Sequence, residues 1–247
     1  MANADELPFS LAGMRVLITG ADGGMGVATS KLCARLGADL ILVDRQKPTG
    51  LAEALPLASS QTVSAVSCDL SDRAQVDAMA KATGPVDGIV DLAAVCPYND
   101  WHEADWNDTL LEVMAINVGG PINLLRAYFP AMVENRFGRV VLTGSLAGRT
   151  GGLRAAPHYS ASKGSVHTLV RWFAQRGSSH NVLVNGISPG TTDTPMMRGQ
   201  GYDPSAFPLG RFATPEEMAG PIAFLLSPAA SFVAGVILDV NGGIHYS

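Results

Sequence analysis

The sequence predicts an α/β protein in which a doubly wound, mostly parallel sheet of about seven strands has helices on both faces. Three observations lead to this fold class. Short runs rich in Val, Ile and Leu recur along the chain, segments with helical periodicity separate them, and a glycine-rich turn follows the first run. Short apolar runs are typical of strands buried on both sides, and their alternation with helices implies right-handed crossovers between parallel strands.

The elements follow one another in a regular order. Strand 14–19 precedes helix 25–36, strand 39–43 precedes strand 62–66, and helix 73–82 comes next. The second half continues with strand 87–95, helix 110–133, strand 139–143, helix 162–176, strand 181–187, helix 215–226 and strand 236–240. No repeat, low-complexity tract or linker divides this series, so we expect a single dinucleotide-binding and catalytic domain over residues 1–247.

Length and composition favour a protein that binds small molecules. The 247 residues suit one large domain, and 47% of them are hydrophobic while 16% are charged. Average soluble domains have about 25% charged residues. Because this chain has fewer charged residues and enough hydrophobic residues to form a core, intrinsic disorder is excluded. The net charge of −5 offers no basic face to nucleic acid or to anionic lipid. We therefore expect a small-molecule substrate, no nucleic-acid partner and no membrane partner.

The cysteines and the start of the chain favour the cytoplasm. Cys33, Cys68 and Cys96 are widely spaced and form neither a metal-binding pair nor a disulfide framework. The five histidines likewise lack a metal-binding spacing, so no metal site is expected. Residues 1–10 are polar and acidic, without the features of a signal peptide, and no segment is typical of a membrane span.

A glycine-rich segment, TGADGGMG at residues 19–26, comes directly before the first predicted helix. Glycines permit a sharp turn and a close backbone approach, while the helix N-terminus supplies amide donors for a pyrophosphate. The segment fits both GxxxGxG and GxxGxxG, so its spacing leaves the type of turn open. This context predicts a dinucleotide-binding turn and therefore a Rossmann-like sheet.

An acidic residue at the end of the second strand favours NAD over NADP. Asp44 lies near the spacing expected of a carboxylate that accepts hydrogen bonds from the adenosine ribose. Like charges about 4 Å apart at an effective dielectric of 20 repel by about 4 kcal/mol, which disfavours a 2′-phosphate. Asp22 adds negative charge on the same side, whereas Arg45 is a counterweight because arginine suits phosphate binding. We expect NAD to be preferred by at least about tenfold.

Tyr159 and Lys163 are four residues apart at the start of a predicted helix, so both side chains lie on one helical face. The pKa of a tyrosine must fall by about 3 units, or about 4 kcal/mol, before it accepts a proton near neutrality. A lysine cation about 4 Å away at an effective dielectric of 20 supplies about that much. The pair predicts acid/base chemistry, and the alternative is an amphipathic helix with a solvated lysine.

Ser145 follows strand 139–143 at the carboxyl edge of the sheet, where doubly wound folds bind their ligands. Its surroundings, GSLAG, lack the GxSxG pattern of a nucleophile elbow. We therefore expect a hydroxyl that positions a substrate oxygen. Residues 191–212 form the one long irregular stretch, and loops of that length are often lids, so we expect a substrate-binding loop there.

Together these motifs resemble the short-chain dehydrogenase/reductase family, in its compact single-domain branch, over about residues 13–243. Further matching motifs are CDL at 68–70, INV at 116–118, NGISPG at 185–190, GRF at 210–212 and DVNGG at 239–243. The resemblance implies cofactor contacts from Gly20, Asp22, Gly24, Met25, Gly26, Asp44, Arg45, Asp69, Leu70, Ala93, Ala94, Tyr159, Lys163, Pro189, Gly190, Thr192 and Thr194.

The resemblance also implies a catalytic set of four residues. Tyr159 is expected to be the general acid/base, with Lys163 lowering its pKa and holding the nicotinamide ribose. Ser145 is expected to hydrogen-bond the substrate oxygen, and Asn117 to hold a water that relays protons to Lys163. Around the substrate the resemblance implies Ser145, Cys96, Leu146, Leu153, Tyr159, Met196 and Met197. Because this lining is mostly apolar, we expect a hydrophobic secondary alcohol or its ketone.

One motif departs from the family pattern. Where the family usually reads Asn-Asn-Ala-Gly after the fourth strand, this chain has Asp91, Leu92, Ala93 and Ala94. Ala94 adds a methyl group where the backbone normally passes close to the cofactor. Asp91 introduces an ionisable group near the centre of the sheet.

Several alternatives were weighed against this interpretation. The extended, epimerase-like branch is disfavoured because no C-terminal substrate domain follows, and enoyl reductases because their Tyr and Lys are spaced more widely. A nucleotide-sensing or scaffold protein on the same fold is the second class of function, because a fold alone does not fix function. The complete catalytic set favours the enzyme. Substrate identity, stereochemistry and physiological direction stay open.

The oligomeric state follows from the surface. Few charges are available to cover it, and segments 110–133, 165–172 and 219–238 are strongly apolar. Family members similar to this chain are commonly tetramers with two-fold axes through such helices and through the last strand, so we expect a homotetramer.

Overall fold

One seven-stranded parallel sheet forms the centre of the computed structural model, which describes residues 8–152 and 154–247. The strand order is β3-β2-β1-β4-β5-β6-β7. The strands are β1 (Arg15–Thr19), β2 (Asp39–Asp44), β3 (Val63–Ser67), β4 (Gly88–Asp91), β5 (Gly138–Thr143), β6 (Val182–Pro189) and β7 (Ile237–Val240). All seven predicted strands are confirmed, and so is the doubly wound, Rossmann-like fold class.

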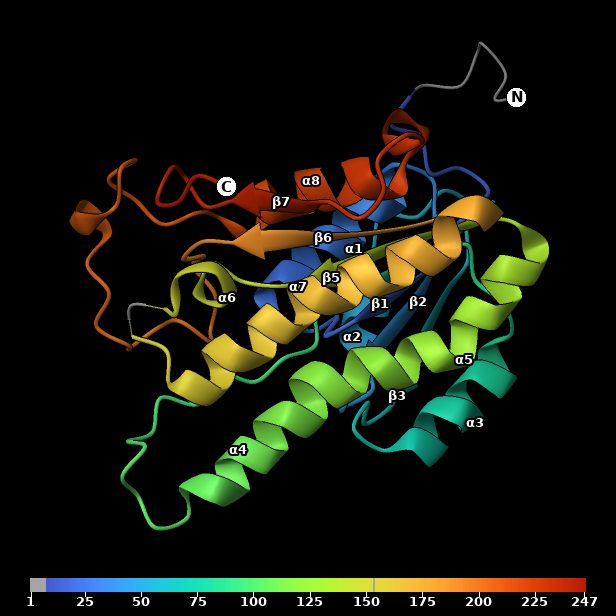
Figure 1. Ribbon diagram of the computed structural model, residues 1–247. Coiled ribbons are helices and arrows are strands. Elements are labelled where there is room, and N and C mark those ends of the chain that lie inside the picture. The colour runs from blue at the N-terminus through green and yellow to red at the C-terminus, as the bar shows by residue number, and fades with distance from the viewer. Residues whose placement is uncertain (1–7, 153) are drawn as a thin grey trace.

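Helices cover both faces of this sheet (Figure 1). The helices are α1 (Gly24–Arg35), α2 (Thr49–Ala54), α3 (Arg73–Thr83), α4 (Trp106–Met114), α5 (Gly120–Asn135), α6 (Ala147–Thr150), α7 (Pro157–Gly177) and α8 (Pro215–Leu226). Helices α1 and α8 pack together on one face, whereas α3, α5 and α7 cover the other. Within the described residues, no helix is both long and apolar enough to cross a membrane.

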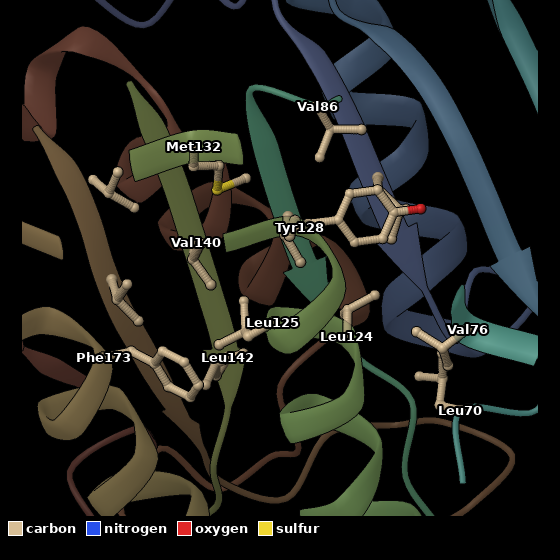
Figure 2. Packing of buried hydrophobic residues seen from close by; sticks show 14 of the residues in the cluster. Leu70, Val76, Val86, Leu124, Leu125, Tyr128, Met132, Val140, Leu142 and Phe173 are labelled. Carbon is tan, nitrogen blue, oxygen red and sulfur yellow. The ribbon is translucent and has the colours of Figure 1, made fainter. Parts of the chain in front are cut away.

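The alternation of side chains along each strand divides the core into two layers. Leu17 on β1 belongs to the layer beneath α3, α5 and α7, whereas its neighbours Val16 and Ile18 belong to the layer beneath α1 and α8. Successive side chains of a strand point to opposite faces, so a sheet covered on both sides needs continuous apolar strands. Figure 2 shows part of the first layer, with Leu70, Val76, Val86, Leu124, Leu125, Tyr128, Met132, Val140, Leu142 and Phe173.

The expected helix over 110–133 has a more complex form. Helix α4 continues into a π-helical turn, η1 (Ala115–Gly119), which continues into α5. A π turn inserts an extra residue into an α-helix and is frequent at functional sites. Asn117 lies in this turn, so the sequence signal for one long helix is correct in extent but does not reveal the local change of pitch.

Four further segments differ from the sequence-based expectations. Helix α7 begins at Pro157, five residues earlier than predicted, because proline suits the first turn of a helix. Strand β4 ends at Asp91 rather than at residue 95, and α2 and α6 were not expected. Residues 191–212 are irregular as predicted, with one short 3₁₀ helix, η3 (Pro204–Ala206), and an isolated bridge between Thr192 and Ala213.

The topology itself locates the site. The chain builds the sheet outward from β1 toward β3 and then returns to β4 on the other side of β1. Ligands of doubly wound proteins bind beyond the carboxyl ends of the strands at such a reversal. The β1–α1 turn, the end of β4 and the end of β5 all lie at this edge.

Candidate active site

The glycine turn between β1 and α1 is closely packed against its own backbone. Gly20 has a φ of +61°, and a Cβ there would lie 2.8 Å from the backbone nitrogen of Ala93. A Cβ at Gly26 would collide with the carbonyl oxygen of Gly20, and one at Gly24 would lie 2.9 Å from Cγ2 of Thr194. These contacts explain the glycines of the GxxxGxG spacing, because each position lacks room for a methyl group. The turn therefore presents backbone amides, which suits a pyrophosphate.

A groove beside this turn brings the expected adenosine contacts together. It has a volume of about 360 Å³, and its lining includes Gly20, Asp22, Asp44, Arg45, Asp69, Leu70, Ala93 and Ala94. The glycine-lined edge and the carboxylate at the end of β2 give this groove the donors and acceptors that a dinucleotide needs. The described residues thus fit such a cofactor.

Two carboxylates face the same end of the groove. Oδ2 of Asp44 accepts a hydrogen bond from the backbone N–H of Asp22 at 3.1 Å, and Oδ1 accepts from the N–H of Arg45 at 2.7 Å. Burial raises the pKa of Asp22, and the charge of Asp44 raises it further. Both acidic groups therefore contribute negative potential where a 2′-phosphate would lie.

The catalytic residues expected from the sequence converge on a second cavity of about 140 Å³. Ser145, Tyr159 and Lys163 line it together. Ser145 comes two residues after the end of β5, and its hydroxyl accepts a hydrogen bond from the backbone N–H of Ala147 at 3.1 Å. Tyr159 and Lys163 project from the first two turns of α7. Met25, Pro189, Gly190, Thr192 and Thr194 line the same cavity.

The cavity and the groove share part of their lining. Leu92, Ala94 and Met196 contribute to both. A molecule that extended from the groove past Ala94 would thus reach the side chains of Ser145 and Tyr159. This continuity is what a dinucleotide with an adenosine end and a reactive end requires.

Burial dominates the electrostatics of Tyr159 and Lys163. The Nζ atom of Lys163 donates a hydrogen bond to the carbonyl oxygen of Thr143 at 2.8 Å and lies 5.8 Å from the centre of the Tyr159 ring. Burial lowers the pKa of Lys163 to about 8, although the charge of Asp91 opposes this. Burial raises the pKa of Tyr159. A hydrogen bond with Ser145 lowers this pKa, but by less than burial raises it.

This result differs from the sequence-based expectation that Lys163 brings the pKa of Tyr159 down toward neutrality. A buried phenol is disfavoured in its charged form, and the loss of hydration outweighs a cation that is itself stripped of water. The protein alone therefore keeps Tyr159 protonated, as a proton donor.

Asn117 does not line the cavity but lies behind it. Its Oδ1 accepts a hydrogen bond from the N–H of Val95 at 2.9 Å. Its Nδ2 donates to the carbonyl of Val95 at 2.9 Å and to Oγ of Ser162 at 3.1 Å. The side chain thus joins the π turn, the segment after β4 and helix α7. These contacts occupy the amide group, so the side chain holds the scaffold of the site together.

The substrate side of the cavity contains most of the expected residues. Cys96, Leu146, Met196 and Met197 line it, whereas the expected Leu153 lies outside the described residues. Tyr98 and Tyr202 also line it and were not identified from the sequence. Tyr98 comes two residues after Cys96, and Tyr202 lies within the irregular 191–212 segment. Their closeness in sequence to residues expected in the site is the signal that could have identified them.

The described residues contain no cluster of His, Cys, Asp and Glu that could hold a metal ion. His158, beside Tyr159, stacks on Trp106 with ring centres 5.3 Å apart, and its Nε2 lies 3.1 Å from Oδ1 of Asn99. This histidine therefore connects α7 to the segment before α4.

Comparisons with known proteins agree with this geometry. A family model described as enoyl-(acyl carrier protein) reductase matches residues 20–245. Galactitol 2-dehydrogenase (L-tagatose-forming) of Cereibacter sphaeroides is 36% identical, over 95% of this chain and 96% of its own. L-rhamnose 1-dehydrogenase (NAD(P)(+)) of Azotobacter vinelandii is 30% identical, over 93% of this chain and 95% of its own.

A solved structure is similar over nearly the same length. A 3-oxoacyl-[acyl-carrier protein] reductase with bound NAD from Brucella melitensis matches with a TM-score of 0.88 at 29% identity, covering 98% of this chain and 95% of that chain. This fold therefore occurs in a protein that binds a nicotinamide cofactor.

Proposed function

The chain belongs to the short-chain dehydrogenase/reductase family of nicotinamide-dependent oxidoreductases, and we propose that it transfers a hydride between NAD(H) and a hydrophobic secondary alcohol or its ketone. One observation carries this proposal. Ser145, Tyr159 and Lys163 line a single cavity that is continuous with a glycine-edged groove. Groups able to transfer a proton thus lie in a cavity that adjoins the expected dinucleotide groove.

The bound nicotinamide supplies the hydride acceptor or donor. The chain itself manages the proton and the substrate oxygen. In ketone reduction, the Ser145 hydroxyl orients the carbonyl oxygen and the Tyr159 hydroxyl delivers the proton to it. In alcohol oxidation the same tyrosine oxygen accepts the proton. Lys163 lies beside Tyr159 and would hold the nicotinamide ribose, and its hydrogen bond to the carbonyl oxygen of Thr143 fixes its Nζ atom.

The choice of NAD rests on Asp44 and Asp22. Their carboxyl groups line one end of the groove, where burial and the charge of Asp44 raise the pKa of Asp22. A 2′-phosphate would add negative charge at that point. Arg45 lines the same groove and is the residue that opposes this preference.

The apolar substrate rests on the lining of the cavity. Cys96, Leu146, Met196 and Met197 surround the Ser145 and Tyr159 hydroxyls. Tyr98 and Tyr202 add two aromatic walls, each with a hydroxyl. Such a lining favours a substrate that has an apolar body and one reacting oxygen.

Two other functions are less well supported. An enoyl reductase, the description of the matching family model, is disfavoured by the four-residue spacing of Tyr159 and Lys163. A nucleotide sensor or scaffold would not need the buried proton donor and lysine that α7 presents. We also propose that the protein forms a homotetramer and is located in the cytoplasm.

Turnover with a panel of simple substrates tests the proposal directly. Cyclic and linear secondary alcohols, polyols and hydroxy acids would each be incubated with NAD, and the corresponding ketones with NADH, while absorbance at the nicotinamide band is followed. We expect the apolar alcohols and ketones to react fastest. A clear preference for a charged substrate contradicts the substrate class, and cofactor binding without turnover of any compound supports the sensor.

A further inference from the structure

Asp91 is a buried carboxyl group at the end of the central strand β4. It is 5% exposed, and the hydroxyl of Thr19 donates a hydrogen bond to its Oδ1 at 2.5 Å. The Thr19 oxygen in turn accepts from the N–H groups of Leu92 and Ala93 at 3.2 and 3.4 Å. Since an uncharged amide could accept the Thr19 hydrogen bond equally well, this contact does not by itself explain a carboxyl group.

The sheet places Asp91 on the same face as the helix that carries Lys163. Asp91 is in register with Thr19 on β1 and with Leu142 on β5. Leu17, Ile89 and Leu142 all belong to the core layer beneath α5 and α7. By the two-residue period of a strand, Asp91 therefore points toward α7.

Lys163 reaches the sheet at the neighbouring strand. Its Nζ donates to the carbonyl oxygen of Thr143, the residue after Leu142 on β5. Lys163 is 3% exposed. A buried ammonium with only neutral hydrogen-bond partners is strongly disfavoured, because it loses its hydration without a compensating charge.

The other ionisable groups around Lys163 do not supply that charge. Tyr159 and Cys96 are partly buried, and burial raises the pKa of each, so both are neutral near pH 7. His167 on the same helix has its pKa lowered to about 4 by burial and by neighbouring cations, so it is neutral as well. Asp91 is the carboxyl group whose charge raises the pKa of Lys163. Burial raises the pKa of Asp91 itself, and the hydrogen bond from Thr19 and the charge of Lys163 oppose this.

We propose that Asp91 is a positioning residue that acts as the counter-ion of Lys163 and keeps its ammonium charged at neutral pH. The pairing takes the place of the amide that the family usually has at this position. Its existence does not depend on the proposed function, whereas its effect on catalytic rate does. An experiment on the unliganded protein and one on turnover therefore separate the two.

The first test is urea unfolding of the unliganded protein between pH 6 and 10.5. The folded pKa of Lys163 lies below its unfolded value, so the unfolded chain binds more protons between the two and stability rises with pH in that window. The rise should begin near pH 8 in the wild type. In Asp91→Asn, which retains an acceptor for Thr19, it should begin at least one pH unit lower.

Lys163→Met provides the matched control. Subtracting the profile of this variant removes the contributions of all other titrating groups. In the Lys163→Met background, Asp91→Asn should not change the pH at which stability begins to rise. An unchanged onset in Asp91→Asn alone, or a shift to higher pH, would overturn the proposal.

A second measurement covers the case in which Asp91→Asn does not fold. The double variant Asp91→Asn/Lys163→Met has neither buried charge, so it should fold where the single variant does not. If the double variant also fails, an uncompensated Lys163 charge is not what prevents Asp91→Asn from folding, and the proposal is wrong.

The third readout is the pH profile of ketone reduction. The alkaline loss of rate should move at least one unit lower in Asp91→Asn, because Lys163 loses its proton earlier. Superimposable profiles would contradict the pairing even if the rates differ. If the protein turns over no ketone, the pH profile cannot be measured and the proposed function is refuted. The unfolding experiment then still decides the role of Asp91.

Discussion

At Tyr159 and Lys163, burial favours the uncharged form of each side chain. Burial raises the pKa of the phenol and lowers that of the ammonium to about 8. The unliganded protein is therefore prepared to donate a proton from Tyr159, and removal of that proton needs additional positive charge. A bound oxidised nicotinamide would supply such charge, and the direction of proton transfer would then depend on the redox state of the cofactor.

Tyr159→Phe tests the acid/base role. The substitution removes one oxygen and leaves the ring packing intact, so turnover should fall by about 10²–10⁴-fold while cofactor affinity changes little. Steady-state kinetics and a fluorescence titration with NADH measure the two effects. Retention of more than a tenth of the wild-type turnover contradicts the assignment.

The pH dependence should differ between the two reaction directions. Reduction needs a protonated Tyr159, which persists to high pH, and a charged Lys163, which is lost as the pH rises through about 8. The reduction rate should therefore fall above about pH 8. Oxidation needs a proton acceptor and should become faster with rising pH until Lys163 is lost. Initial rates from pH 6 to 10 in both directions check this, and parallel profiles would be inconsistent with it.

Asp44→Asn tests the basis of cofactor choice. Removing this charge should lower the preference for NAD over NADP by at least about tenfold in kcat/KM, well within the repulsion of about 4 kcal/mol available to two charges at contact. Asp39→Asn is a matched control, because Asp39 lies at the opposite end of β2, where it accepts hydrogen bonds from Thr62. A wild-type protein that uses NADP equally well would show that Arg45 dominates.

At the level of elements, the β1–α1 turn depends on the absence of side chains at specific points. Gly26 lies against the carbonyl oxygens of Gly20 and Ala21, and Gly20 lies against the backbone after β4. The turn therefore links two strands and a helix through direct backbone contact. The π turn η1 has a related role, because it brings Asn117 between the segment after β4 and α7.

Gly26→Ala and Gly220→Ala are a matched pair that tests this dependence. The added methyl at residue 26 overlaps the Gly20 carbonyl, so the free energy of unfolding should fall by about 1–3 kcal/mol and NAD affinity should weaken. Gly220 lies exposed within α8 with nothing within 4 Å of an added Cβ. There the same change should raise stability by about 0.4–1 kcal/mol. Thermal unfolding with and without NAD measures both, and equal effects at the two positions would refute the argument.

At the level of the whole molecule, two exposed apolar regions suggest how subunits associate. Leu111 on α4 and Trp172 on α7 are exposed on the helices, and Phe232 and Val236 are exposed just before β7. Exposed apolar residues of this size are typical of interfaces. The two regions lie on different elements, as dihedral association about two axes requires.

Light scattering tests the expected homotetramer. At micromolar concentration we expect four times the 25.7 kDa mass of one chain. Trp172→Glu and Phe232→Glu should each reduce the assembly to a smaller species by placing a charge in a different interface. A monomer mass for the wild type would refute the prediction.

Much of the molecule was predictable from local sequence patterns. The seven strands and the major helices follow from apolar runs and helical periodicity, because a sheet buried on both faces demands nearly continuous apolar strands. Ser145, Tyr159 and Lys163 were also identifiable, since the first follows a strand and the other two share a helical face. Their convergence on one cavity follows from strands that all end at the same edge.

Other features were decided by tertiary contacts that no local pattern encodes. The choice among the glycines depends on backbone that arrives from β4, the π turn at Asn117 depends on packing against α7, and Tyr202 enters the cavity from an irregular segment. The pKa values of Tyr159 and Lys163 depend on burial and on Asp91, 72 residues from Lys163 along the chain. The sequence by itself determined which elements form and which groups reach the carboxyl edge of the sheet, because hydrophobic periodicity is local. Only the tertiary structure decided their charge states, because desolvation and pairing depend on neighbours that are distant in sequence.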